Sequence, residues 1–243
     1  MPSVTLLVLI FLVAMIYASV GHGGASGYLA TMSLLVYPPA HMASSALLLN
    51  LLVAGTACLT FWRAGHGSFQ LLWPFIAGSV PAAFVGGRLP VPSRMYGWLL
   101  AVALLVAAAR LWLPTIQQAG SLMRPRLFIA LSVGVGVGLI SGIVGIGGGI
   151  FLSPLMILLR WAETKRTAAA SAGFIVVNSA AGLVGRLVGG RFVIGSLAPL
   201  IVAAFAGGIV GSRLGAGHFS GAWMRRLLAV VLVVAAGKLV AHG

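Results

Sequence analysis

Long apolar stretches, separated by short breaks, follow one another along the whole chain of 243 residues. The breaks fall at glycine, proline and arginine, which commonly end or interrupt a helix in an apolar sequence. Most stretches approach the ~20 residues that a helix needs to cross a bilayer. The pattern therefore predicts an all-α integral membrane protein with a single membrane domain. We place apolar segments at 4–20, 24–37, 43–62, 69–89, 95–113, 127–144, 148–159, 167–187, 193–214 and 222–240.

The second half of the chain repeats the first. At an offset of 125, five positions recur with the same residue: Gly65, Pro74, Gly86, Arg88 and Leu89 become Gly190, Pro199, Gly211, Arg213 and Leu214. Val20-Gly21 recurs as Val144-Gly145 at an offset of 124. Duplication of this kind is typical of transporters built from two repeats. We expect a first transmembrane repeat in 1–113, a linker in 114–126 and a second repeat in 127–243.

The second segment of each half is too short for a comfortable membrane crossing. Segments 24–37 and 148–159 have about 12 to 14 residues, so each is expected to form a short broken or re-entrant helix. An odd number of crossings in each half then makes the two repeats inverted. Inverted repeats place ten of the fifteen Lys and Arg residues on the cytoplasmic side, whereas parallel repeats split them eight to seven. Charge placement therefore favours inverted repeats.

Composition removes several classes of protein. Hydrophobic residues make up 60% of the chain and charged residues 7%, which leaves no polar stretch long enough for a soluble domain. The net charge is +14, but the basic residues fall mostly at segment ends, where they set topology and snorkel, so we expect no nucleic-acid partner. Glu163 is the only acidic residue and lies between segments. A proton or sodium relay based on membrane carboxylates is thereby excluded.

The chain also lacks an obvious set of ligands for a metal or a cofactor, and we expect neither. Cys58 is the single cysteine and lies in an apolar run, where we interpret it as a packing residue. His41, His66, His218 and His242 lie at segment ends and are interpreted as interfacial. No cluster of His and Asp residues is present to bind a divalent cation.

A glycine-rich run opens the short segment of each half. The first is Gly21-His22-Gly23-Gly24, and the second is Gly145-Ile146-Gly147-Gly148-Gly149. Clustered glycines leave backbone amides unshielded, and a helix that begins there directs its free N–H groups and positive dipole end at the gap. We interpret the two runs as halves of one anion site. The alternative left open is that these glycines are small-residue packing contacts between helices.

Polar side chains near the glycine runs complete the predicted site. Hydroxyl and amide groups there can donate to an anion, although they also serve as hydrogen-bonding links between membrane helices. His22 is the only titratable group inside either run; it could carry a proton or pair with an anion, or be a structural histidine. The predicted substrate-binding residues are Gly21, His22, Gly23, Gly24, Ser26, Asn50, Gly145, Gly147, Gly148, Gly149, Ser171 and Asn178.

Four runs of the chain together resemble a known family. They are Val20 to Gly24, Gly142 to Gly149 with Pro154 behind it, Ala43-Ser44-Ser45, and Arg166 to Gly173 leading to Asn178-Ser179. On these runs the chain resembles the TauE/SafE family of sulfite and organosulfonate exporters, and the likeness spans essentially its whole length. The resemblance implies a multi-pass transporter of small sulfur-containing or carboxylate anions.

Three functions fit this pattern, and we favour a secondary transporter that exports small anions by alternating access. Export needs no dedicated ion site, because the membrane potential drives anions out of a cell that is negative inside. The second function is an anion channel or a permease powered by ATP. Because the chain has no Walker-type motif, the ATPase of such a permease would be a separate protein. The third, least favoured, is an intramembrane serine hydrolase with Ser26 as nucleophile, which would need a facing histidine base.

The expected surroundings follow from these functions. The partners are a small anionic substrate and the lipid bilayer, and the formation of a homo-oligomer is left open. We expect the protein in the cell membrane, as a multi-pass protein of a bacterial inner membrane.

Overall fold

The computed structural model describes residues 3–35, 39–112, 122–193 and 197–216, together with 229, 230, 232–234, 236, 237 and 240. Within these residues the regular structure is helical, and no strand is present. The helices are α1 (Val4–Ala18), α2 (Ala25–Leu34), α3 (Pro39–Arg63), α4 (Phe69–Arg88), α5 (Ser93–Trp112), α6 (Leu127–Val144), α7 (Gly149–Leu158), α8 (Thr164–Val188) and α9 (Ala198–Ala216).

The helix lengths confirm the all-α membrane fold that the sequence predicts. Among the described residues, five helices are long and apolar enough to cross a membrane: α3, α4, α6, α8 and α9. In contrast, α2 and α7 have 10 residues each, which is about half of a crossing. The short segment predicted after each glycine run is therefore a short helix. The last predicted segment, 222–240, lies mostly outside the described residues.

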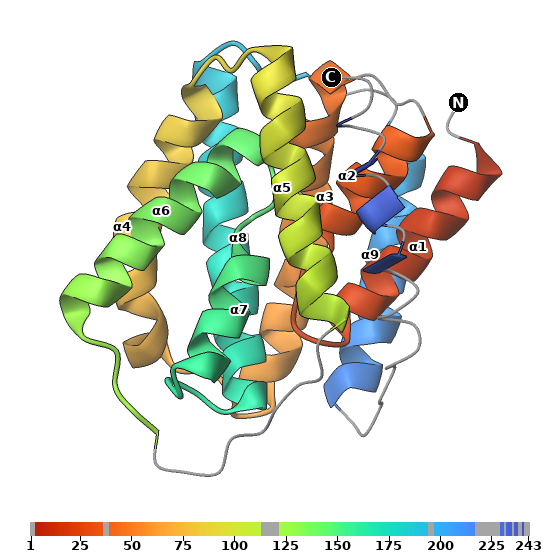
Figure 1. The fold of residues 1–243 in the computed structure, drawn as a ribbon. Coiled ribbons are helices and arrows are strands. Elements are labelled where there is room, and N and C mark those ends of the chain that lie inside the picture. Colours follow the sequence, from red (N-terminus) through yellow and green to blue (C-terminus); the bar gives the residue numbers. More distant parts are fainter. Residues whose placement is uncertain are drawn as a thin grey trace.

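The helices are arranged as one bundle. Figure 1 shows α4 and α6 at one edge, α1 and α9 at the opposite edge, α3 and α8 between them, and α5 in front. Side-chain caps fix the starts of two helices: the amide of Leu6 donates to Ser3 Oγ at α1, and the amide of Leu71 donates to Ser68 Oγ at α4. The short helix α2 is buried against α1 and α3, and the short helix α7 packs mainly on α8.

Glycines set the closest approaches between helices at both edges. A Cβ on Gly138 of α6 would collide with the backbone of Ser79 on α4, and a Cβ on Gly211 of α9 would collide with the backbone of Met15 on α1. Contact through small residues is how membrane helices pack without a hydrophobic driving force between them. Both contacts join a helix from 1–113 to a helix from 127–243. Each edge of the bundle therefore combines the two halves of the chain.

At the centre, α3 and α8 run antiparallel. Near the end of α3, Trp62 Nε1 donates to the carbonyl oxygen of Ala169, near the start of α8, at 3.2 Å. Near the start of α3, Ser44 Oγ donates to the carbonyl oxygen of Arg191, just after α8, at 3.4 Å. Inverted repeats require this course for two equivalent helices, but the inversion of the complete halves stays a prediction.

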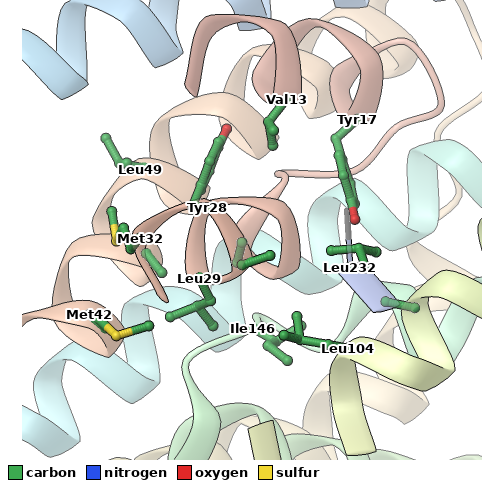
Figure 2. Close-up of a cluster of buried hydrophobic side chains, with 14 of the residues drawn as sticks. Val13, Tyr17, Tyr28, Leu29, Met32, Met42, Leu49, Leu104, Ile146 and Leu232 are labelled. Carbon is green, nitrogen blue, oxygen red and sulfur yellow. The ribbon is translucent and has the colours of Figure 1, made fainter. Parts of the chain in front are cut away.

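Besides a small apolar cluster between α3 and α8, two larger apolar clusters lie in the described part of the bundle. The larger joins α1, α2, α3 and α5, and Figure 2 shows Ile146 of the second glycine run among its side chains, with Leu29 and Leu104. The smaller joins α4, α6, α7 and α8, and the rings of Phe75 and Trp161 lie 5.5 Å apart in it. The glycines of both runs are buried, and Ile146 places the second run within the larger cluster.

Candidate functional site

Both glycine runs form tight loops that open the short helices. Gly24 and Gly148 are the N-cap residues of α2 and α7, with φ of 94° and 80°, in the left-handed region that favours glycine. Neither helix has a side chain that caps it from its N-cap position. The first-turn amides of both helices are thus left to be satisfied by groups from elsewhere in the fold.

Asn50 of α3 joins the two loops. Its Oδ1 accepts from the amide of Ala25, the first residue of α2, at 3.3 Å. Its Nδ2 donates to the carbonyl oxygen of Ile146 in the second loop and to Ser179 Oγ on α8, both at 3.1 Å. An amide N–H only donates and a carbonyl only accepts, so these partners fix the orientation of the Asn50 side chain. A fully buried amide therefore connects both halves of the predicted site.

The glycines leave room for this amide. A Cβ on Gly23 would collide with Asn50 Oδ1, and a Cβ on Gly147 would collide with Asn50 Nδ2. Gly147 also has a φ of 77°, which an L side chain rarely adopts. Glycine is required at both positions because the two loops close on the same side chain.

The first loop makes a second polar contact with the other half of the chain. His22 Nδ1 lies 3.0 Å from the carbonyl oxygen of Val20, which can only accept, so Nδ1 carries a proton. His22 Nε2 lies 3.0 Å from Ser153 Oγ on α7, and Ser153 Oγ lies 2.7 Å from Ser171 Oγ on α8. This chain of polar groups joins the first loop to α7 and α8.

The Ser153 hydroxyl has more possible acceptors than its one hydrogen can serve. It also lies 2.9 Å from the carbonyl oxygen of Gly149 and can donate to it. A single hydroxyl hydrogen is given to one acceptor at a time: His22 Nε2, Ser171 Oγ or the carbonyl oxygen of Gly149. Ser153 therefore links the first loop to the start of α7.

The equivalent contact in the other half is apolar. At the offset of 124 that relates the loops, His22 corresponds to Ile146 and Ser153 corresponds to Leu29. Ile146 and Leu29 belong to the same buried hydrophobic cluster, where Figure 2 shows both. The polar pair of His22 and Ser153 in one place is matched by the apolar pair of Ile146 and Leu29 in the other. If only one member of the polar pair were replaced, the other would be buried without a hydrogen-bond partner. These contacts explain why the first loop has His22 where the second loop has Ile146.

Ser26 and Asn178 are buried but take no part in the contacts between the two loops. Ser26 Oγ lies 2.7 Å from the hydroxyl of Tyr17. Asn178 Nδ2 donates to Phe174 in its own helix at 2.8 Å, and its buried Oδ1 has no partner among the described residues. Asn178 therefore does not mirror the bridge that Asn50 makes.

The outer glycines pack against the opposite half. A Cβ on Gly21 would meet Ala168 at 2.6 Å, and a Cβ on Gly145 would meet Ala43 at 2.9 Å. Gly149 instead packs within its own half, where a Cβ would collide with Ile175. Small-residue packing and the polar contacts of Asn50 and His22 thus occur in the same two loops.

Two residues in these contacts were not among the predicted binding residues. Ser179 Oγ accepts a hydrogen bond from Asn50 Nδ2, and Ser153 joins His22 to Ser171. A serine inside a short, otherwise apolar segment was the sequence signal for Ser153, and the adjacent Asn178-Ser179 pair was the signal for Ser179. The sequence does not show that Ser179, and not its neighbour Asn178, lies on the face of α8 that meets the loops.

Comparisons with known proteins agree with this architecture. The profile of the family described as "Sulfite exporter TauE/SafE" matches residues 6–239. A curated protein of Sinorhizobium fredii, "Probable membrane transporter protein y4hK", is 33% identical over 241 residues, which cover 98% of each chain. No solved structure matches.

Proposed function

Because the chain belongs to the sulfite exporter TauE/SafE family, we propose that it is a secondary transporter that exports small anions such as sulfite, organosulfonates or related sulfur and carboxylate anions. The family makes it a multi-pass membrane transporter and not an enzyme. The anion, the direction of transport and the alternating-access mechanism are our proposals.

The observation that carries the proposal is the meeting of the two glycine loops at Asn50. Loops from both halves of the chain reach the same buried amide, and each opens a short helix without a capping side chain at its N-cap. Helix N-termini are ready sites for an anion, because N–H groups and the positive dipole end point the same way, and at α2 the first amide is already held by Asn50. Short helices that meet near the middle of a membrane form the substrate sites of transporters with repeats.

The polar groups near the loops suit an anion better than a cation. The neighbouring groups include backbone amides, the hydroxyls of Ser153, Ser171 and Ser179, and the ring of His22. All of these can donate a hydrogen bond to an anionic oxygen. The chain's single carboxylate, on Glu163, is exposed and lies before α8. A small anion would therefore meet donors in this region and no fixed negative charge of a side chain.

The packing suggests which parts move. The edge formed by α4 and α6 and the edge formed by α1 and α9 are each held by close glycine contacts. The two edges meet through α3, α8 and the hydrogen bonds of Asn50 and His22. We propose that alternating access consists of a movement between these two edges, each of which contains helices of both halves.

Transport by the purified protein in liposomes tests the proposal. The wild-type protein should move radiolabelled sulfite or a sulfonate without ATP, and Gly23→Ala should lose most of this flux because its methyl group collides with Asn50. Gly55→Ala is the matched control, since a Cβ there meets nothing within 4 Å. Equal flux in Gly23→Ala and Gly55→Ala would refute the site. A wild-type flux that requires ATP and a second protein would favour an ATPase-partnered permease, and flux through an open conduit would favour a channel.

A further inference from the structure

A buried arginine lies beside the second glycine loop. Arg186 is in the last turn of α8 and exposes 3% of its surface. Its Nη2 donates to the carbonyl oxygens of Gly142 and Ile143, at 3.2 and 2.6 Å. These carbonyls belong to the last turn of α6, directly before Gly145. The guanidinium is therefore held at the entrance to the second loop.

Arg186 has no acidic side chain to neutralise it. Glu163, the only acidic residue of the chain, precedes the other end of α8, about 35 Å away at ~1.5 Å per helical residue. Among the described residues, the side chains that interact electrostatically with Arg186 are Tyr96 and a second cation, Arg191, whose own guanidinium donates to the carbonyl oxygen of Leu89. The hydrogen-bond partners of Arg186 are carbonyl oxygens at the negative end of the α6 helix. A buried cation normally has an anionic partner.

One edge of the guanidinium is incompletely used. Arg186 Nε is buried and has no hydrogen-bond partner among the described residues. A buried N–H without a partner is costly, and more so on a charged group. The edge formed by Nε and Nη2 can pair with two oxygens of one oxyanion when Nη2 exchanges one of its two carbonyl partners for an oxygen of the anion.

The equivalent position in the first half shows that the scaffold does not need this charge. At the offset of 125, Arg186 corresponds to Phe61 on α3, which exposes 2% of its surface. The first half buries an aromatic ring where the second buries a cation. A requirement of the repeated fold would apply to both halves, so the charge has a role in the second half alone.

We propose that Arg186 binds the anionic group of the transported substrate as it passes the second glycine loop. This inference rests on the proposed transport function and narrows its substrate to oxyanions that offer at least two oxygens, such as sulfite, sulfonates and carboxylates. One carbonyl of α6 keeps the guanidinium oriented, while Nε and the Nη2 hydrogen released from the other carbonyl donate to two oxygens of the anion. A chloride ion, which has a single centre, gains less from this edge.

Sulfite transport by full-length variants in phosphatidylcholine liposomes tests the inference, because neutral lipid provides no competing anionic headgroup. Arg186→Gln keeps an NH2 donor for the carbonyls of α6 but removes the charge, and Arg186→Lys keeps the charge but loses the two-oxygen edge. Arg213→Gln removes an exposed arginine from the last turn of α9 and is the matched control. The Tm of each variant is measured without sulfite, so that loss of folding is seen separately.

The expected result is a KM for sulfite raised about 10- to 100-fold in Arg186→Gln, the size of a lost charge-assisted hydrogen bond. Arg186→Lys should raise the KM less, Arg213→Gln should leave it unchanged, and excess chloride should compete poorly with sulfite in the wild type. A wild-type KM in both Arg186 variants would overturn the inference and make Arg186 a structural cap of α6. If Arg186→Gln does not fold, Arg186→Lys becomes the test of the inference. An unchanged KM for sulfite in that variant overturns the inference, and a raised KM at the wild-type Tm supports it. Failure of the wild type to move any of these anions would instead refute the proposed function.

Discussion

Replacing Asn50 by alanine should destabilise the protein by an amount that the structure defines. The side chain makes three buried hydrogen bonds, to Ala25, Ile146 and Ser179, at 3.3, 3.1 and 3.1 Å. A hydrogen bond between membrane helices contributes ~0.6 kcal/mol on average, so the three together contribute about 2 kcal/mol. For a chain of this size, that loss lowers the Tm by about 4–8 °C.

Asn178→Ala is the matched control for this measurement. Asn178 is equally buried, but its one hydrogen bond runs to Phe174 in the same helix. Its removal should lower the Tm by no more than about 2 °C. Thermal unfolding in detergent, followed by tryptophan fluorescence, gives both values. An Asn50→Ala variant as stable as the wild type, or an Asn178→Ala variant that loses more, would show that Asn50 does not hold the loops together.

Three further predictions concern packing, the polar chain and the hydrolase alternative. Gly138→Leu should prevent α6 from seating against α4, whereas Gly136→Leu, at a position with open space around it, should give a normal yield of monodisperse protein in size-exclusion chromatography; equal yields would contradict the packing argument. Ser153→Ala removes the hydroxyl that joins His22 to α7 and α8 and should lower the initial sulfite flux about tenfold, the effect of ~1.4 kcal/mol; wild-type flux would show that the contact is dispensable. A serine-directed fluorophosphonate should leave the wild-type protein unlabelled, because the hydroxyl of Ser26 is hydrogen-bonded to a tyrosine. Labelling at Ser26 would contradict this and support a hydrolase.

The helices and the two loops were predictable because their signals are local. The length of each apolar run sets the length of a membrane helix, and a glycine cluster marks where it breaks. The sequence therefore predicted α2 and α7 as short helices behind Gly24 and Gly148, as the structure shows. Duplication also pointed to the same two loops as candidates for one site.

The contacts that join the loops were not predictable, because their partners are far apart in the sequence. Asn50 reaches Ile146 and Ser179 across 96 and 129 residues. Asn178 was predicted as a binding residue together with Asn50, yet it bonds within its own helix, and its neighbour Ser179 meets Asn50 instead. Burial of Arg186 likewise depends on which side of α8 faces the bundle, which the apolar pattern of a membrane helix defines weakly.

The glycine contacts at the two edges also determine the order in which the protein can be assembled during synthesis. α4 is complete at Arg88, but its partner α6 begins only at Leu127, and α1 waits for α9, which begins at Ala198. The first half therefore enters the membrane with its glycine-packing surfaces unpaired, and neither half can finish folding by itself. We expect residues 1–113 expressed alone to be degraded. When the two halves are expressed together as separate chains, we expect them to assemble into the folded bundle in the bilayer. The two repeats are synthesised one after the other, but the fold is complete only when helices of the first repeat have packed against helices of the second.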